Sequence, residues 1–241
     1  DKSVTFWRKN SMQLNKGEWQ VLAMQIQSRI PYINIKLKDD SGLKKSYQFA
    51  VDTGAPDYLY LNDQLAKGFS FPENSFDCVL ENFEGKNTKQ TSRIAYAQLA
   101  STEFFDVAAH NIPSFKDEYG IGLIGSGLLR NFDVHFNYHE STIAFRKNRS
   151  FTQNTLVDRS GIALEPHILG GIVQEVAPKS PAHEIGIAAN AIVTKINGIS
   201  LNTSNFDTLS ALLSSSKKSI DICWLKNSKE QCHKLYLVDR I

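Results

Sequence analysis

Short runs in which hydrophobic and polar residues alternate dominate the chain, and this period of two is typical of half-buried β-strands. The pattern is clearest where Ile33, Ile35 and Leu37 are separated by single polar residues. The turn sequence Asp-Asp-Ser-Gly follows at 39–42, and an apolar stretch at 47–51 leads back. The sequence therefore predicts a β-hairpin whose second strand delivers the next residue, an aspartate.

The first part of the chain is predicted to be built almost entirely of β-strands. Residues 1–28 form an N-terminal extension with a weaker pattern, in which 18–26 fits either a strand or a helical turn. The later strands share β-branched and aromatic residues between polar turns, and we expect them over 76–83, 88–99, 104–107, 132–138 and 143–145.

A polar stretch separates this part from a second, mixed pattern. Because 149–159 carries no strand pattern, we predict a linker there, between a first domain at 1–148 and a second at 160–241. Ser180 followed by Pro181 is typical of a helix start, which predicts a short helix ending near Ile187. The other elements expected in this part are strands over 171–176, 191–196, 220–225 and 234–238, an Asn-Gly turn at 197–198 and a helix over 206–213.

Composition narrows the classes of function. The chain has 241 residues, of which 41% are hydrophobic, and a net charge of +2. This charge does not favour nucleic acid as a partner, and no apolar run approaches the ~20 residues of a transmembrane helix. The sequence begins at Asp1 without a methionine, so a signal or anchor removed before this residue stays open.

The main candidate for chemistry is the sequence Phe-Ala-Val-Asp-Thr-Gly-Ala at 49–55. A buried strand that stops at Asp52 places a carboxylate in a turn, where Gly54 lets backbone amides approach it and Thr53 offers a hydroxyl. An ordinary strand–turn–strand is the alternative, because Asp and Gly are common in turns. The apolar residues on both sides favour a buried functional turn over a solvated one.

This motif resembles the active-site loop of aspartic proteases in the single-lobe, retropepsin-like form. The stretch Gly120–Gly125 is similar to the second motif of that family, which passes beneath the catalytic loop and supports it. The match covers roughly 30–146 and departs at Pro56, where many relatives carry a small polar residue. The resemblance implies a mainly β fold with one closed acid-protease lobe, no cofactor, and catalytic roles for Asp52, Thr53 and Gly54.

The resemblance also implies contacts with a peptide substrate. In the family, a hairpin folds over the substrate as a flap, which here assigns Gly85 and, beside the catalytic residues, Ala55 to substrate binding. An exposed hairpin without a lid role is the alternative. Two-lobed relatives often carry Ser or Thr at the position of Ala55, where a hydroxyl favours the charged carboxylate. We therefore expect a pH optimum less acidic than that of the stomach enzymes.

A homodimer follows from the count of catalytic motifs. Aspartic proteolysis needs two carboxylates that share a proton, and this chain has one Asp-Thr-Gly. A symmetric dimer supplies the second carboxylate as Asp52 of the other subunit, with the threonines beneath them bonded across the interface in the family. Asp133 lies in a strand pattern without a following Thr-Gly and is a poor second carboxylate.

The second domain resembles PDZ domains of the bacterial, circularly rearranged type. The residues that carry this resemblance are 173–176, 180–182, 185–187 and 192–198, with a departure at Ala189-Asn190, where relatives usually have Gly-Asp. Such domains bind a peptide C-terminus through loop amides and an added strand. The resemblance assigns this role to Gly161, Ile162, Ala163 and Leu164, whereas Phe206, Leu209 and Leu213 fit either an apolar pocket or the core.

Cysteine and histidine positions add one expectation. If the residues at 227–228 form a two-residue turn, Cys223 and Cys232 lie opposite each other and can form a disulfide, which implies a periplasmic or other extracytoplasmic location. Two reduced core cysteines are the alternative. His135 and His139 lack further ligands at metal-binding spacing, so we expect no metal site.

Three classes of function remain open at this point. The favoured one is a homodimeric aspartic endopeptidase whose PDZ-like domain binds substrate or regulatory peptides. The others are a non-catalytic peptide-binding PDZ protein with an inactive protease-like dimerisation domain, and a structural dimerisation module. The sequence names neither the substrate nor the cleavage preference.

Overall fold

The computed structural model describes residues 4–6, 14–15, 17–71, 78–82, 85–112, 121–226 and 228–239, with the backbone alone for 78–82 and 85–89. The chain divides into two compact units. The first comprises Asp1–Phe69, Ile94–Ala109 and Phe115–Thr155, and the second comprises Ser70–Arg93, His110–Ser114 and Leu156–Ile241. The last division, between Thr155 and Leu156, falls inside the segment predicted as a linker, whereas 70–93 and 110–114 were predicted within the first domain.

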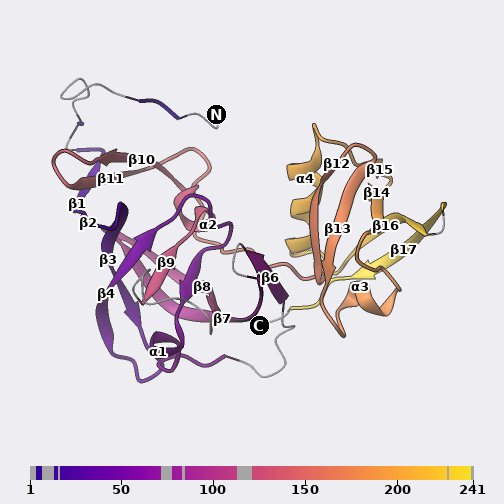
Figure 1. Cartoon of the computed structure of the whole chain (residues 1–241), viewed down its shortest axis with the longest axis horizontal. Helices are drawn as coiled ribbons and strands as arrows, with labels where there is room; N and C mark the ends of the chain where they lie inside the picture. Colours follow the sequence, from indigo (N-terminus) through magenta and orange to yellow (C-terminus); the bar gives the residue numbers. More distant parts are fainter. Residues whose placement is uncertain are drawn as a thin grey trace. The chain divides into compact units, whose positions relative to one another are not determined.

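The largest sheet has eight strands in the order β2-β3-β4-β9-β5-β8-β7-β6. Because β3 also pairs with β7, six of these strands form a closed ring, β3-β4-β9-β5-β8-β7, as expected for a closed lobe. The strands are β2 (Gln25–Gln27), β3 (Ile30–Lys38), β4 (Lys44–Val51), β5 (Leu59–Leu61), β6 (Cys78–Asn82), β7 (Gly85–Leu99), β8 (Thr102–Asn111) and β9 (Gly122–Ile124) (Figure 1).

The predicted hairpin is present as β3 and β4, which pair from Tyr32 with Ala50 to Lys38 with Lys44. Alternate residues from Ile33 to Leu37 point into the core, where Leu37 is fully buried, while the polar Asn34 and Lys36 between them are exposed. The turn is closed by the Asp39 carboxylate, which accepts a hydrogen bond from the Leu43 amide at 3.0 Å. This confirms the hairpin and its register, because a slip by one residue would turn the apolar side chains outward.

A second, three-stranded sheet and two short helices complete the first unit. Its order is β1-β11-β10, so the ambiguous stretch at 18–26 contributes strands rather than a helical turn. Phe132 and Phe145 pack edge to face with ring centroids 5.6 Å apart, next to Phe104 at 6.0 Å from Phe132. These elements are β1 (Gln20–Ala23), α1 (Asp63–Ala66), α2 (Ser126–Leu129), β10 (Phe132–Asn137) and β11 (Thr142–Lys147).

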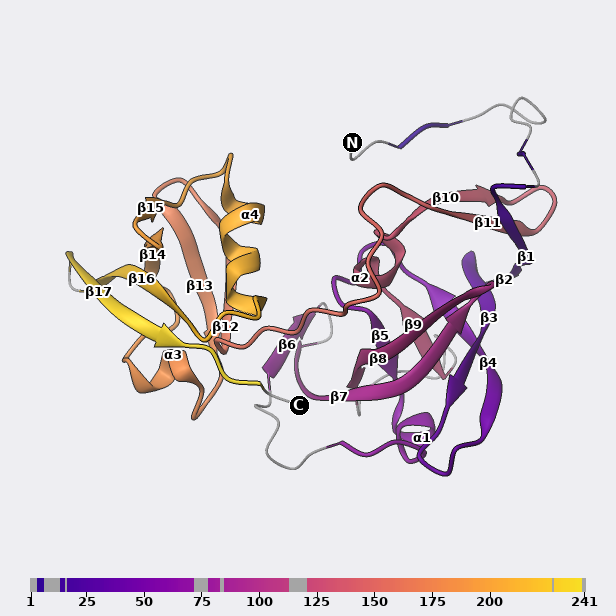
Figure 2. The same cartoon turned by 180° about the vertical axis from the view of Figure 1, so that it is seen from behind.

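The second unit contains a sheet in the order β12-β13-β14-β16-β17, with β15 paired to β14. In both views α4 lies beside β12 and β13 (Figure 1 and Figure 2). The core includes the fully buried Trp224 and the helix residues Phe206, Leu209 and Leu213. The elements are β12 (Ile162–His167), β13 (Gly170–Val176), α3 (Pro181–Glu184), β14 (Ile192–Ile196), β15 (Ile199–Ser200), α4 (Phe206–Ser210), the 3₁₀ helix η2 (Ala211–Ser214), β16 (Ser219–Lys226) and β17 (Lys229–Tyr236).

Two local signals read from the sequence in this unit are confirmed, whereas α3 ends at Glu184 rather than near Ile187 and the last strand spans Lys229–Tyr236 rather than 234–238. Ser180 caps α3, with its hydroxyl accepting a hydrogen bond from the His183 amide at 3.2 Å. The Asn-Gly turn has positive φ at both Asn197 and Gly198, and it joins β14 to β15. The fold is therefore mainly β, with a smaller α+β unit at the C-terminal end, as predicted. No helix among the described residues is long and apolar enough to cross a membrane.

Candidate active site

Asp52 directly follows β4, whose last residues Phe49, Ala50 and Val51 are buried. Its amide donates to the carbonyl of Ile124 at 3.0 Å. The Asp52 side chain is half-buried, while Thr53 and Gly54 are exposed. The buried strand thus ends at the carboxylate, as predicted, but the turn that follows is exposed at Thr53 and Gly54 rather than buried as the flanking apolar residues had indicated.

The turn after Asp52 orients the carboxylate. The Gly54 amide donates to Asp52 Oδ1 at 2.8 Å. A Cβ at position 54 would lie 3.2 Å from the same oxygen, so the absence of a side chain permits this approach. The structure therefore brings together two of the three predicted catalytic residues, with Thr53 between them.

Strand β9 lies between β4 and β5, the two strands that flank this turn. It pairs in parallel with β4, Val51 opposite Ile124, and antiparallel with β5, Leu59 opposite Ile124. Parallel pairing requires a long connection, which the intervening strands provide. The described part of the second motif, 121–125, thus supports the Asp52 turn as the resemblance implied; Gly120 lies outside the described residues.

The start of α2 holds the rest of the loop through backbone hydrogen bonds. The Ser126 amide and hydroxyl both donate to the Ala55 carbonyl, at 2.7 and 2.9 Å. The Gly125 amide donates to the Tyr58 carbonyl at 3.0 Å, and the Gly127 amide donates to the Asp57 carbonyl at 3.0 Å. The sequence analysis identified Gly125 but missed Ser126 and Gly127, although the Gly-Ser-Gly spacing was the available signal.

The approach at these glycines is close enough to exclude any side chain. A Cβ at Gly125 would lie 2.2 Å from the Asp57 carbonyl oxygen, and one at Gly127 would lie 2.7 Å from the same oxygen. A third glycine, Gly122, packs beneath the loop, where a Cβ would lie 2.4 Å from the ring of Phe49. The loop from Ala55 to Tyr58, which follows the Asp52 turn, is therefore held by close backbone contacts, and the strand before Asp52 packs through Phe49 against Gly122.

Asp57 and Tyr60 form a polar pair at the end of the loop that the sequence analysis did not identify. The Tyr60 hydroxyl accepts a hydrogen bond from the Asp57 amide at 3.0 Å and donates to Asp57 Oδ2 at 3.1 Å. Burial, and then the charge of Asp57, raises the pKa of Tyr60 well above its ordinary value. The neutral hydroxyl is thus the form that supports the loop.

Asp133, considered as a second carboxylate, is engaged elsewhere. Its Oδ2 accepts hydrogen bonds from Arg146 Nε and Nη2 at 3.1 and 2.8 Å. The Arg146 guanidinium also contacts Glu18 at 3.1 Å. Asp133 therefore belongs to a group of ion pairs on β10 and β11, in agreement with the prediction that it is a poor second catalytic carboxylate.

The tip of the predicted flap lies outside the described residues. Strands β6 and β7 pair antiparallel, with Asn82 opposite Gly85, but residues 83–84 lie outside the described residues. Gly85 is the first residue of β7. By its contacts the hairpin belongs to the second unit, whereas Asp52 belongs to the first. The flap role of Gly85 stays a prediction.

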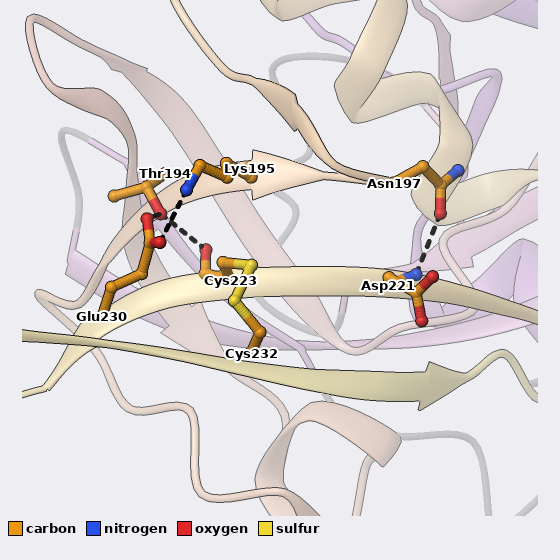
Figure 3. The surroundings of a disulfide bond; sticks show 7 residues. All are labelled: Thr194, Lys195, Asn197, Asp221, Cys223, Glu230 and Cys232. Carbon is orange, nitrogen blue, oxygen red and sulfur yellow. Dashed lines mark hydrogen bonds and ion pairs between the residues drawn. A yellow bond between two sulfur atoms is a disulfide. The ribbon is translucent and has the colours of Figure 1, made fainter.

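The predicted disulfide between Cys223 and Cys232 is confirmed. The two residues lie directly opposite each other on β16 and β17, and Lys226 opposite Lys229 leaves a two-residue turn. Figure 3 shows Glu230 beside the disulfide, where it accepts hydrogen bonds from Lys195 at 2.6 Å and Thr194 at 2.7 Å. These bonds hold the pKa of Glu230 below its ordinary value.

Among the described residues, the one group of His, Cys, Asp and Glu side chains with ligand spacing is Cys223, Glu230 and Cys232. Both cysteines are in the disulfide, so their thiolates are not available as ligands. His135 is on β10 opposite Ala144, and His139 contacts Glu140 at 3.5 Å.

The residues predicted to bind peptide in the second unit lie at the start of β12, an edge strand of the sheet. Gly161 has a φ of +81° and Ile162 is buried, while Ala163 is exposed and Leu164 is half-buried against the core. The three helix residues weighed as pocket or core, Phe206, Leu209 and Leu213, are members of the core cluster.

Comparison with known proteins finds a family match within the second unit. Residues 172–223, from β13 into β16, match the family model described as PDZ domain. No curated protein matches the chain at a significant level. Among solved structures, the chain is similar to a retropepsin-like aspartic protease from Rickettsia conorii, with 22% identity, coverage of 52% of this chain and 97% of that chain, and a TM-score of 0.41.

The assignment of each unit therefore rests on a different kind of observation. The first resembles a single aspartic-protease lobe through its closed ring of strands and its supported Asp-Thr-Gly turn. The second is a PDZ domain, by its family match and by the order of its strands and helices.

Proposed function

We propose that the chain is an aspartic endopeptidase that hydrolyses peptide bonds with a water activated by two Asp52 carboxylates. The observation that carries this proposal is the Asp52 turn itself. A half-exposed carboxylate is oriented by the Gly54 amide at 2.8 Å on a loop that buried strands hold in place. A site on rigid elements suits a reaction that depends on position.

The chemistry requires a second copy of the same residue. One carboxylate accepts a proton from the attacking water while the other, protonated, donates to the carbonyl oxygen of the scissile bond. Two carboxylates this close cannot both ionise easily, so a single proton is shared between them. We propose a homodimer in which the exposed Thr53 and Gly54 of two subunits face each other.

The PDZ domain is proposed to bind extended peptide and so to select or retain substrates. An edge strand such as β12 offers unpaired backbone groups to an added peptide strand. The disulfide between Cys223 and Cys232 supports an extracytoplasmic, for example periplasmic, location, because disulfides persist in oxidising compartments.

A non-catalytic, peptide-binding protein is the second candidate. It is favoured by one observation, which is that the matching family model describes the PDZ domain rather than the protease-like unit. In that case the first unit would serve as a dimerisation domain without hydrolytic activity.

Cleavage of an unfolded protein substrate across a range of pH tests the proposal. Wild-type protein is expected to cleave it, and Asp52→Asn, which keeps the shape but removes the charge, is expected to lose at least about 10³-fold in rate. Asp133→Asn is the matched control, because that carboxylate pairs with Arg146, and its activity should stay within about twofold. Residual cleavage by Asp52→Asn at the wild-type rate would exclude the proposed chemistry and leave the second candidate.

A further inference from the structure

The loop before β12 is where the resemblance to PDZ domains places the amides that bind a terminal carboxylate. In this chain these amides already contact a carboxylate of the protein itself. The Ser160 amide donates to Asp158 Oδ1 at 3.1 Å, and the Gly161 amide donates to Asp158 Oδ2 at 2.6 Å. The next amide, that of Ile162, donates to Ser160 Oγ at 3.1 Å. Three consecutive amides are therefore occupied from within the unit.

The carbonyl groups of the same loop are also in use. The Ala182 amide donates to the Ser160 carbonyl at 3.1 Å, and the Ala177 amide donates to the Gly161 carbonyl at 2.8 Å. Ser160 and Ser180 are fully buried, and a Cβ at Gly161 would lie 2.1 Å from the Ser180 Cβ. The loop is thus fixed against α3, and a rotation that would present other amides to a ligand would break these contacts.

The positively charged side chain on this loop, that of Arg159, is bound to other parts of the same domain. Arg159 Nη1 donates to the carbonyls of Ser215 at 2.6 Å and Lys217 at 3.0 Å, and Arg159 Nε pairs with Asp239 at 2.7 Å. A terminal carboxylate entering this place would meet the carboxylate of Asp158, which already occupies the Ser160 and Gly161 amides. The local charge therefore disfavours a free C-terminus.

Among the described residues, the strand that follows has a neighbouring strand on one side only. Strand β12 is at the edge of the sheet and pairs with β13 on one side. Ala163 and Glu165 are exposed, while Leu164 packs against the core. Pro166 has no N–H, and only alternate residues of an edge strand direct their N–H away from the neighbouring strand, so the backbone donors available for an added strand are those of 163–165 that do not face β13. An extended segment can pair here without any group entering the loop.

We propose that the PDZ domain binds an internal segment of extended polypeptide along β12, and that Asp158 excludes free C-termini from the loop. This inference rests on the proposed peptide binding by the second unit. It defines the class of ligand: an unfolded or looped region within a chain, whose backbone continues past the loop in both directions.

Two pools of the same random dodecapeptides, one with free C-terminal carboxylates and one with C-terminal amides, test the inference. The full chain carrying Asp52→Asn is used, so that peptides are not cut. Retention of the amide pool is expected to equal or exceed that of the free-acid pool. Hydrogen exchange on the same complex is expected to slow at those amides of 163–165 that do not face β13, which locates the contact on β12.

Substitution of Asp158 is expected to reverse the preference between the two peptide pools. Asp158→Ala frees the loop amides, so we expect it to gain a preference of at least about tenfold for the free-acid pool. Asp158→Asn keeps an acceptor oxygen without the charge and is expected to lie between these two. Glu184→Gln, which removes an exposed carboxylate on α3, is the control and should behave as the parent. Melting temperatures verify that each variant is folded.

The outcomes separate this inference from the proposed function. A preference of the parent chain for free acids, or an unchanged preference in folded Asp158→Ala and Asp158→Asn, would overturn the role of Asp158 while leaving peptide binding intact. Retention of neither pool, with no slowed exchange on β12, would overturn both.

Discussion

At the scale of single residues, the geometry of Asp52 depends on glycines as much as on polar groups. Gly54 donates its amide to the carboxylate, and Gly125 and Gly127 lie against the loop carbonyls. Gly125 and Gly127 are tight because backbone approaches backbone, and a carbonyl oxygen cannot rotate aside as a flexible side chain can. The site is therefore sensitive to the smallest possible additions of volume.

Gly125→Ala tests this dependence. The added methyl group would lie 2.2 Å from the Asp57 oxygen, so we expect a loss of about 1–3 kcal/mol or more in unfolding free energy and a displaced Asp52 turn. Urea denaturation with a parallel cleavage assay measures both effects. Gly68→Ala is the control, because a Cβ there meets Leu65 at an ordinary 3.5 Å. Equal stability of the two variants would contradict the proposed close contact.

Tyr60 gives a pH dependence of stability with a definite sign. Its pKa is raised above the ordinary value of 10.0 by burial and by Asp57, so the folded state holds the phenol proton more tightly than the unfolded state does. The contribution of Tyr60 is therefore fully present below about pH 10 and decreases as the pH rises beyond it. Tyr60→Phe is expected to show a shallower alkaline loss of stability than wild type.

Thermal melts between neutral and alkaline pH measure this difference. Tyr60→Phe should also be less stable at neutral pH by about 1 kcal/mol, because the Asp57 amide loses its acceptor. Tyr138→Phe is the control, since that ring is 55% exposed. If the melting temperatures of wild type and Tyr60→Phe fell equally with rising pH, the raised pKa of Tyr60 in the folded state would be contradicted.

The sequence predicted the central residues of the site and the approach of a backbone amide to the Asp52 carboxylate, but not the contacts that hold the rest of the loop. Asp52 and Gly54 were recognisable because a polar turn within an apolar run is unusual for a solvated loop. The bonds from Ser126 and Gly127 to the loop were not, because they join residues far apart in the chain whose pairing depends on β9. Asp158 was also missed, since an aspartate in a polar linker gives no sign that it contacts the amides that follow.

At the scale of secondary structure, strands with strict alternation were predicted well. The hairpin of β3 and β4 and the turn between β16 and β17 follow from local patterns alone. Where the sequence pattern is weak, pairing with a distant strand determines the secondary structure. For example, β1 is a strand because its residues pair with β11, from Gln20 opposite Phe145. The position of β9 between β4 and β5 could not be predicted from local sequence patterns, because its three residues do not indicate with which strands they pair.

The hairpin of β16 and β17 supplies a prediction about covalent structure. Thiol titration of the denatured, unreduced protein should find one free thiol of the three cysteines, which is that of Cys78. Reduction should lower the unfolding free energy by about 2–3 kcal/mol, because the cross-link no longer restricts the unfolded chain.

The double variant Cys223→Ser, Cys232→Ser is the control for this effect. Its melting temperature should be low from the start and should not change when a reductant is added. Three titratable thiols in the unreduced wild type would contradict the bond and, with it, the support for an extracytoplasmic location.

At the scale of the whole molecule, the proposed reaction makes activity depend on protein concentration. A chain with one Asp-Thr-Gly cannot share a proton within itself, so specific activity should fall on dilution below the dimer dissociation constant. Sedimentation of the same samples gives the fraction of dimer at each concentration. The two curves are expected to coincide.

Mixing wild type with Asp52→Asn adds an independent measurement of the same prediction. With random exchange of subunits, an equal amount of the variant should remove about half of the activity per wild-type chain, and an excess should remove nearly all of it. Asp133→Asn, mixed in the same way, should have no such effect. Full activity in a demonstrably monomeric sample would require a second carboxylate within one chain.

The parallel pairing of Val51 with Ile124 has a consequence for the order in which the protein is made. While the chain is being synthesised, Asp52 emerges long before the strand that lies beside it. Until β9 is available, β4 and β5 have no common partner, and the start of α2 is not present to fix the Ala55 and Asp57 carbonyls. A nascent or truncated chain that stops before residue 122 therefore carries the whole Asp-Thr-Gly motif but no assembled site, and the proposed proteolytic activity is delayed until synthesis of the first unit is almost complete.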